Sequence, residues 1–141
     1  MAKKLQLRII TPDIVKFDEP VDMVIMRCTT GDMGILPGRA PVSAVLDFGV
    51  MRIISDYEER GIAIYGGVTQ VQDDEVLVLC NGAEWPEEID RHAVELERAE
   101  AERRMKETQD KAQLQKDHFT MRRALVQIEV SSYPILGAHK K

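Results

Sequence analysis

Glycine and strong helix formers are distributed so unevenly along this sequence that one architecture cannot account for both of its parts. Of the nine glycines only Gly137 lies after residue 85, and four of the six prolines also lie in the first part. Residues 87–110 contain neither glycine nor proline and are rich in Ala, Glu, Arg and Lys, which favour α-helix. The break near Pro86 predicts two structural units, residues 1–85 and residues 86–133, followed by a tail over residues 134–141.

The first unit has the pattern of short β-strands. Leu5, Leu7 and Ile9 alternate with polar residues, which indicates a half-buried strand. Further apolar runs with β-branched residues predict strands at 21–30, 50–55, 62–65 and 76–80. Turn residues separate these runs at 11–13, 30–32, 37–38, 47–49, 66–67 and 73–74. Frequent turns without a helical period predict an antiparallel β-sandwich or flattened barrel.

The second unit has the pattern of two helices. Pro86 suits a first helical turn, and residues 87–110 predict the first helix, with charge pairs at Arg98–Glu102, Glu100–Arg104 and Glu102–Lys106. Its apolar stripe is thin and consists of Ile89, Ala93, Leu96, Ala99 and Met105. The stripe of the second helix recurs at steps of 4, 3, 4 and 3 and consists of Leu114, His118, Met121, Leu125 and Ile128. The predicted fold is therefore mainly β plus α, an antiparallel β-sandwich followed by a two-helix hairpin.

The thin stripes bear on how firmly the hairpin is held. Helices gain most of their stability from packing, so two highly charged helices with small apolar faces predict a hairpin of marginal stability that can rearrange. A hairpin that lies permanently on the sheet fits the same pattern.

Composition and motifs exclude several classes of function. The net charge of −5 argues against nucleic acid as the main partner. We expect no catalytic residues and no metal site, because the chain has no nucleophile elbow, phosphate-binding loop or dinucleotide fingerprint and no close set of Cys and His ligands. No leader and no apolar run of about 18 residues is evident, so we interpret Cys28 and Cys80 as reduced, buried residues of an intracellular protein.

Five arginines of the helical unit allow two interpretations. They are Arg98, Arg103, Arg104, Arg122 and Arg123. By default such residues form a solvated face paired with neighbouring glutamates. Alternatively they meet an acidic partner surface or a phosphate, because the arginine fork suits both.

A series of short motifs runs along the whole chain in a fixed order. Residues 31–41 read GDMGILPGRAP and are followed by Leu46 and by GVMRI at residues 49–53. Later motifs are GGV at 66–68, VLVL at 76–79, AE at 83–84 and EID at 88–90. Together they resemble the epsilon subunits of bacterial F-type (F1Fo) ATP synthases.

The resemblance implies a non-catalytic stalk subunit of a proton- or sodium-translocating complex, peripheral on the cytoplasmic face of the cell membrane. In this family the sandwich contacts the gamma subunit and the c ring, and couples ring rotation to the catalytic head during ATP synthesis. The hairpin either folds against the sandwich or extends into the alpha–beta head and inhibits ATP hydrolysis. The expected partners are therefore gamma, the c ring and the alpha–beta head, without nucleic acid.

The resemblance also assigns contact residues. Thr30, Gly31 and Asp32 match positions that face the c ring and gamma. Arg39 stands in the same contact where the family usually has histidine, which implies a permanent cation there. Arg122 and Arg123 follow the stripe residue Met121, and the resemblance implies that they make the inhibitory contact with an acidic segment of the beta subunit.

The match to the family's ATP motif is incomplete. Some members bind ATP through Ile/Leu-Asp-x-x-Arg-Ala at the start of the first helix, and here Ile89 and Asp90 match while Ala93 takes the arginine position. Arg91 lies two residues too early, about 200° around the helix. Arg103, Arg104, Arg122 or Arg123 could substitute only in part.

We therefore expect no cofactor, with ATP at most a regulatory ligand near Ile89, Asp90, Arg103 and Arg122. The alternative functions are a free-standing ATP-sensing module and a generic adaptor domain.

Overall fold

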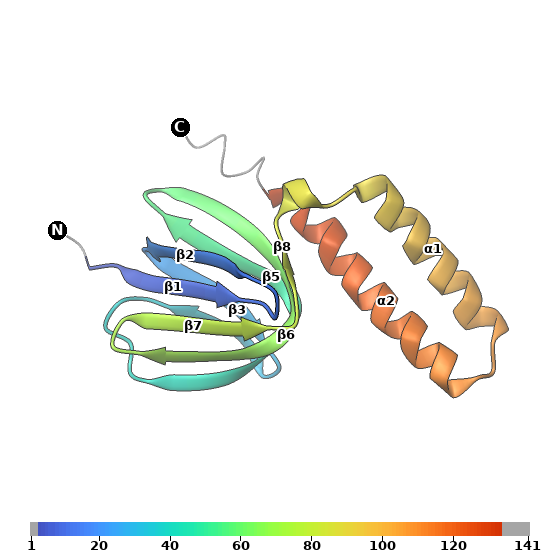
Figure 1. The fold of residues 1–141 in the computed structure, drawn as a ribbon, viewed down its shortest axis with the longest axis horizontal. Helices are drawn as coiled ribbons and strands as arrows, with labels where there is room; N and C mark the ends of the chain where they lie inside the picture. The colour runs from blue at the N-terminus through green and yellow to red at the C-terminus, as the bar shows by residue number, and fades with distance from the viewer. Residues whose placement is uncertain (1–2, 134–141) are drawn as a thin grey trace.

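The computed structural model describes residues 3–133, and the predicted tail at 134–141 lies outside them. Figure 1 shows a β-sandwich with a helical hairpin at one end, which confirms the predicted fold class. The strands are β1 (Leu5–Ile10), β2 (Val15–Val21), β3 (Met23–Cys28), β4 (Gly31–Ile35), β5 (Val42–Ser55), β6 (Glu58–Gln72), β7 (Glu75–Cys80) and β8 (Ala83–Glu84). The helical part consists of a 3-10 turn η1 (Pro86–Glu88), α1 (Arg91–Glu107) and α2 (Lys111–Val130).

Two long strands join the layers of the sandwich. The strands pair in the order β2-β1-β7-β6-β5-β3-β4, and β8 adds to β6. Residues 42–46 of β5 pair with 67–71 of β6 beside β7, whereas residues 48–55 pair with 58–65 beside β3. The prediction of a wholly antiparallel sandwich is wrong at one pair, because β1 and β7 run parallel. Local alternation identifies a strand but carries no information on the direction of a partner that is distant in sequence.

The corner between the two layers lies inside β5 and β6. The sequence predicts turns at residues 47–49 and 66–67, but these residues lie within the continuous strands β5 and β6. The predicted strands 50–55 and 62–65 are therefore segments of longer ones. Gly66 and Gly67 have φ of +80° and +151°. A Cβ on Gly67 would lie 2.2 Å from the carbonyl oxygen of Leu79. Glycine here therefore serves a bend within the sheet, where the backbones approach closely.

The sandwich has a core of its own. The main hydrophobic cluster draws its buried members from residues 5–83, with Trp85 packed against it. The rings of Phe17 and Trp85 close the edge of this cluster, with their centroids 5.8 Å apart. Cys28 and Cys80 are buried and form no disulfide, as predicted, and burial raises the pKa of both thiols.

Aspartate caps set the starts of both helices. The side chain of Asp90 accepts a hydrogen bond from the backbone N–H of Ala93, and that of Asp110 accepts one from Ala112. The first helix thus begins at Arg91 rather than at residue 87, because Pro86–Glu88 forms a separate 3-10 turn. The three predicted charge pairs of α1 are confirmed, with nitrogen–oxygen distances of 3.0, 3.5 and 3.8 Å.

The residues that form the contact between the two helices are shifted by about one position from the predicted stripes. Val94 and Ala101 of α1 and Asp117 and Ala124 of α2 are buried. Five residues of the predicted stripes are instead exposed: Ala93, Leu96, Ala99, His118 and Leu125.

The sandwich explains this shift. Val126 and Val130 of α2 pack against the strands, and this contact fixes the rotation of the helix. Ala124 precedes Val126 by two residues, about 200° around the helix, and therefore faces away from the strands. The apolar stripe of a helix sequence carries no information on the contact with the sandwich, so it cannot predict which residues face the other helix.

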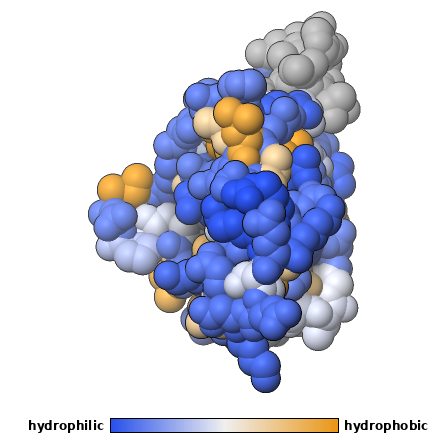
Figure 2. All heavy atoms as spheres, turned by 90° about the vertical axis from the view of Figure 1, so that its right-hand side faces the viewer, coloured by the Kyte–Doolittle hydropathy of each residue, from blue (hydrophilic) through white to orange (hydrophobic). Residues whose placement is uncertain are grey.

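Only part of the hairpin lies against the sandwich. In Figure 1, α2 lies between the strands and α1, and its N-terminal end is directed away from the strands. The contact of α2 is with β5 and β6. The outward face of the hairpin is largely hydrophilic (Figure 2).

We predict that removal of residues 87–141 leaves a folded sandwich, because the main cluster lies within residues 5–85. The truncated chain should retain a β-type circular dichroism spectrum and unfold cooperatively in urea. Its free energy of unfolding should fall by about 3 kcal/mol, the order of magnitude for the apolar contact of two valines. Aggregation or a non-cooperative transition, beside a cooperative full chain, would mean that the helices complete the core.

Candidate functional site

The contact between α2 and the bent β5–β6 pair has a small apolar centre, which we call the docking cluster. Its buried members are Val50, Ala63, Tyr65, Val126 and Val130. Phe48, Ile89 and Tyr133 are partly buried around it. Gly61 leaves room for the ring of Tyr133, since a Cβ on Gly61 would lie 2.6 Å from its Cγ.

Arg122 is bound to the corner of the sandwich. Its guanidinium donates to Oδ1 of Asp47 at 2.5 Å and lies 4.5 Å from the ring centroid of Phe48. The ring of Phe119, one helical turn earlier, meets Phe48 edge to face at 5.3 Å. Since Arg122 and Asp47 are 54% and 39% exposed, the ion pair contributes about 0–1 kcal/mol, and the cation–π contact a similar amount.

Arg123 contacts a second carboxylate and a second ring. Its Nη2 lies 3.9 Å from Oε1 of Glu84, and its guanidinium carbon lies 5.3 Å from the ring centroid of Tyr65. The same Oε1 accepts hydrogen bonds from the Tyr65 hydroxyl and from Nε2 of Gln127. Burial raises the pKa of Tyr65, and its hydrogen bond to Glu84 raises it further. Arg123 and Glu84 also line a cavity of about 360 Å³ between α2 and the β1–β2 turn.

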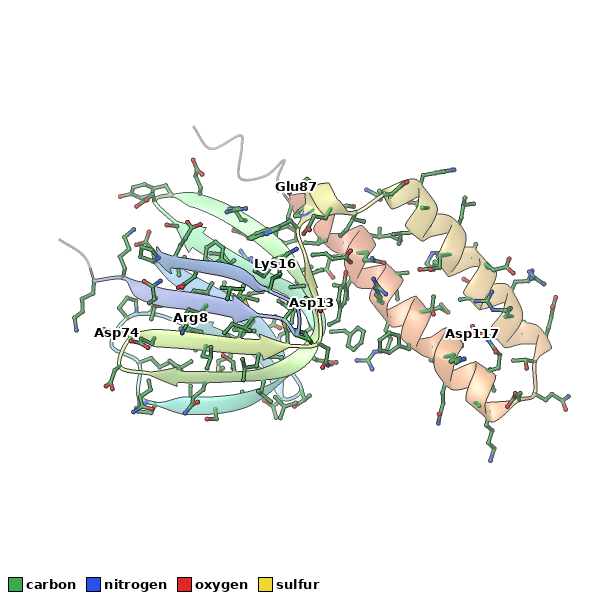
Figure 3. The ribbon with its side chains drawn as sticks, in the orientation of Figure 1. Arg8, Asp13, Lys16, Asp74, Glu87 and Asp117 are labelled. Carbon is green, nitrogen blue, oxygen red and sulfur yellow. The ribbon has the colours of Figure 1, made fainter. Side chains whose placement is uncertain are left out.

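Two buried oxygens reduce the stability of the hairpin. Oε1 of Gln127, beside the sandwich, and Oδ2 of Asp117, between the two helices, are buried without a hydrogen-bond partner among the described residues. Asp117, labelled in Figure 3, uses its other oxygen to accept from Arg104 and Gln113, each at 3.2 Å. An unsatisfied buried oxygen costs about 1–3 kcal/mol, so the one on Gln127 offsets much of the gain from the arginine contacts.

Asp32 lies beside the docked hairpin. Its Oδ1 is 3.9 Å from Nε of Arg27, and Nη2 of Arg27 is 3.5 Å from Glu129 of α2. Thr30 and Gly31, which precede Asp32, are exposed at the same turn. These three candidate contact residues therefore lie on the hairpin side of the sandwich.

Arg39 lies at the other end. Its neighbour Gly38 donates its backbone N–H to Oδ1 of Asp74 at 2.7 Å, which attaches the loop after β4 to the β6–β7 turn. Figure 3 labels Asp74 at the end of the sandwich away from the helices. The five-residue strand β4 spans about 16 Å between Gly31 and this loop. The structure therefore does not bring Arg39 together with Thr30, Gly31 and Asp32.

The candidate nucleotide residues are engaged separately. Ile89 packs on the docking cluster and Asp90 caps α1. Arg103 pairs with Glu100 and Glu107 of its own helix, whereas Arg122 pairs with the sandwich. In the described structure these four residues do not share one contact.

An exposed apolar row is the surface that sequence reasoning missed. Val45, Val68 and Leu79 are directly paired across β5, β6 and β7, and are 55%, 49% and 45% exposed. They line a groove of about 310 Å³ on the outer face. The available signal is VLVLC at residues 76–80, which is apolar on both faces of a strand whereas a solvated sheet alternates.

Residues 3–133 hold no group of three or more Cys, His, Asp or Glu side chains arranged to bind a metal ion. Among the helices of this part, none is sufficiently long and apolar to cross a bilayer.

Comparison with known proteins gives sequence matches along most of the chain. Residues 4–86 match the family model described as ATP synthase, delta/epsilon chain, beta-sandwich domain. An ATP synthase epsilon chain of Synechococcus elongatus is 42% identical over 72% of this chain and 74% of its own length. That of Trichodesmium erythraeum is 37% identical over 90% and 95%. That of Bacillus velezensis is 32% identical over 92% and 98%.

Solved structures share the fold at lower identity. A chain of the Euglena gracilis mitochondrial ATP synthase, from a structure of its OSCP, F1 and c-ring, matches with a TM-score of 0.79 and 22% identity, covering 98% of this chain and 82% of that one. A chain from the central stalk and c-ring of the Tetrahymena thermophila enzyme matches with a TM-score of 0.57 and 13% identity, covering 92% and 99%. At these identities the likeness concerns the fold.

Proposed function

The chain belongs to the epsilon-chain family of ATP synthases, and from this premise we propose that it is a non-catalytic rotor subunit of the central stalk. In this proposal it couples c-ring rotation to the catalytic head during ATP synthesis and inhibits ATP hydrolysis through its movable hairpin. It acts at the cytoplasmic face of the cell membrane, to which it is attached through the complex that transports hydrogen or sodium ions.

One observation carries the inhibitory part of the proposal. The hairpin is held to the sandwich by α2 through a small docking cluster and half-exposed arginine contacts, while the main core excludes it. The exposed ion pairs contribute little, and Oε1 of Gln127 is buried at this contact without a hydrogen-bond partner among the described residues. The hairpin can therefore leave the strands without unfolding the sandwich, and partner contacts of a few kcal/mol suffice to shift the equilibrium.

The sandwich supplies the stalk contacts in this proposal. Thr30, Gly31 and Asp32 form one contact with the c ring and gamma, and Arg39 forms a second contact at the other end of β4. We add the row of Val45, Val68 and Leu79 as the surface that binds gamma, because an apolar groove on an outer sheet face favours a protein partner.

The proposed function does not require this subunit to bind ATP. Arg103 and Arg122 are each paired elsewhere, and Ala93 replaces the arginine of the family's ATP motif. Saturable ATP binding by the isolated chain would favour the ATP-sensing alternative. Failure to co-purify with gamma and the c ring would favour a generic adaptor.

We predict that Arg122→Ala with Arg123→Ala raises ATP hydrolysis by the reconstituted complex. An interfacial charge contact of about 1.4 kcal/mol corresponds to about a tenfold change in the inhibited population. The relief should approach that produced by removal of residues 111–141, as measured by steady-state phosphate release.

The matched control is Arg98→Ala with Arg103→Ala, because these arginines pair with glutamates of their own helix. This variant should hydrolyse ATP as the unaltered complex does. Unchanged hydrolysis in the Arg122 and Arg123 variant, beside clear activation by truncation, would assign inhibition to other residues.

We also predict that Val68→Lys weakens gamma binding about tenfold, since a charge placed in an apolar contact costs on the order of 1–3 kcal/mol. Binding of the full chain to gamma is measured by titration, with circular dichroism as a check of folding. Leu96→Lys, at a side chain that is 60% exposed on α1, should bind gamma normally. Equal affinities of the two variants would exclude the apolar row from the gamma contact.

A further inference from the structure

Two adjacent arginines of α2 meet the same kind of group at two separate places on the sandwich. Arg122 has the carboxylate of Asp47 and the ring of Phe48, both at the corner in β5. Arg123 has the carboxylate of Glu84 in β8 and the ring of Tyr65 in β6. Each guanidinium thus faces one carboxylate and one aromatic face.

The sandwich itself positions one of the two carboxylates. Oδ1 of Asp47 accepts the backbone N–H of Phe48 at 2.8 Å, within the corner where β5 passes between the layers. This bond does not involve the hairpin, so Asp47 is already oriented when α2 arrives. Glu84 accepts the hydroxyl of Tyr65 and also Nε2 of Gln127 from α2, and Tyr65 belongs to the docking cluster, so the arrangement around Glu84 is completed by the docked helix.

Geometry makes this contact exclusive. Val126 and Val130, one and two turns beyond the arginines, bury their side chains in the docking cluster, so the arginine-bearing segment of α2 lies directly over the strands. While α2 is docked, the Arg122 nitrogen that donates to Asp47 and the guanidinium face over Phe48 are not available to an acidic segment of another chain. Contact with the sandwich and contact with the head therefore exclude each other at the same two side chains.

We infer that Asp47, supported by Glu84, is an internal competitor for the arginines that inhibit the head, so that the sandwich restrains inhibition by occupying Arg122 and Arg123. This inference rests on the proposed function, in which those arginines meet the beta subunit. It adds a regulatory role for two acidic residues of the sandwich.

Substitutions of Arg122 and of Asp47, the two members of one ion pair, should therefore change ATP hydrolysis in opposite directions. Loss of Arg122 removes both the contact with the sandwich and the contact with the head. Loss of the Asp47 charge removes only the first and leaves Arg122 free for the head. The variant Asp47→Asn keeps the oxygen that accepts from Phe48, so the corner is retained.

The first measurement uses the isolated full chain. Hydrogen exchange over residues 111–130 should show a two- to fivefold loss of protection in Asp47→Asn and in Arg122→Ala alike, the range for an exposed ion pair. Asp18→Asn is the control, because Asp18 pairs with Arg8 and Gln6 within the sandwich. The reversal Asp47→Arg with Arg122→Asp should recover protection relative to either single change. Unchanged protection in Asp47→Asn would overturn the inference.

The second measurement uses the reconstituted complex. Asp47→Asn should lower ATP hydrolysis two- to fivefold, whereas Arg122→Ala should raise it. Asp47→Asn that leaves hydrolysis unchanged or raises it, despite a loosened α2, would overturn the competition. If Arg122→Ala fails to raise hydrolysis while both variants loosen α2, the proposed contact with beta fails and the contact with Asp47 stands as a purely structural one.

Discussion

The contact between α2 and the bent β5–β6 pair is the interaction on which the arrangement of this molecule depends. The glycines at the corner allow both strands to pass between layers, and the corner presents Phe48 and Asp47 beside Tyr65. Because α2 docks there through Val126 and Val130, its rotation is fixed and α1 must pack on its opposite side. The position of every helical side chain follows from that contact, whereas the sandwich core is complete without it.

Local chemistry determines the parts that the sequence predicted correctly. The composition break at Pro86, the alternation in β1 and the i,i+4 charge pairs of α1 each depend on neighbours within a few residues. The parallel pairing of β1 with β7, the corner inside β5 and the shifted seam at Ala124 depend instead on partners that are distant in sequence. On highly charged helices the apolar stripe is too small to distinguish between two helix rotations that differ by one residue.

The sequence named residues of the candidate site but did not indicate what those residues contact. Arg122 and Arg123 follow from the resemblance, but their acceptors Asp47 and Glu84 lie 75 and 39 residues earlier in the chain and have no pattern that links them to α2. Glu84 and Asp47 are partly exposed carboxylates, which in a sequence are indistinguishable from ordinary surface charge. In the proposed function, weak contacts of this kind suit a hairpin that leaves the sandwich, because each is readily replaced by an acidic surface of another chain.

A covalent clamp tests most directly whether movement of the hairpin inhibits hydrolysis. A Cβ built on Gly61 lies 2.9 Å from Cβ of Tyr133, so Gly61→Cys with Tyr133→Cys places two thiols within reach of a disulfide after a small adjustment. Both native cysteines are buried, which leaves the new pair as the reactive one. If movement of the hairpin causes inhibition, the oxidised complex should hydrolyse ATP without inhibition and a reductant should restore inhibition. Equal inhibition in the oxidised and reduced states would contradict it.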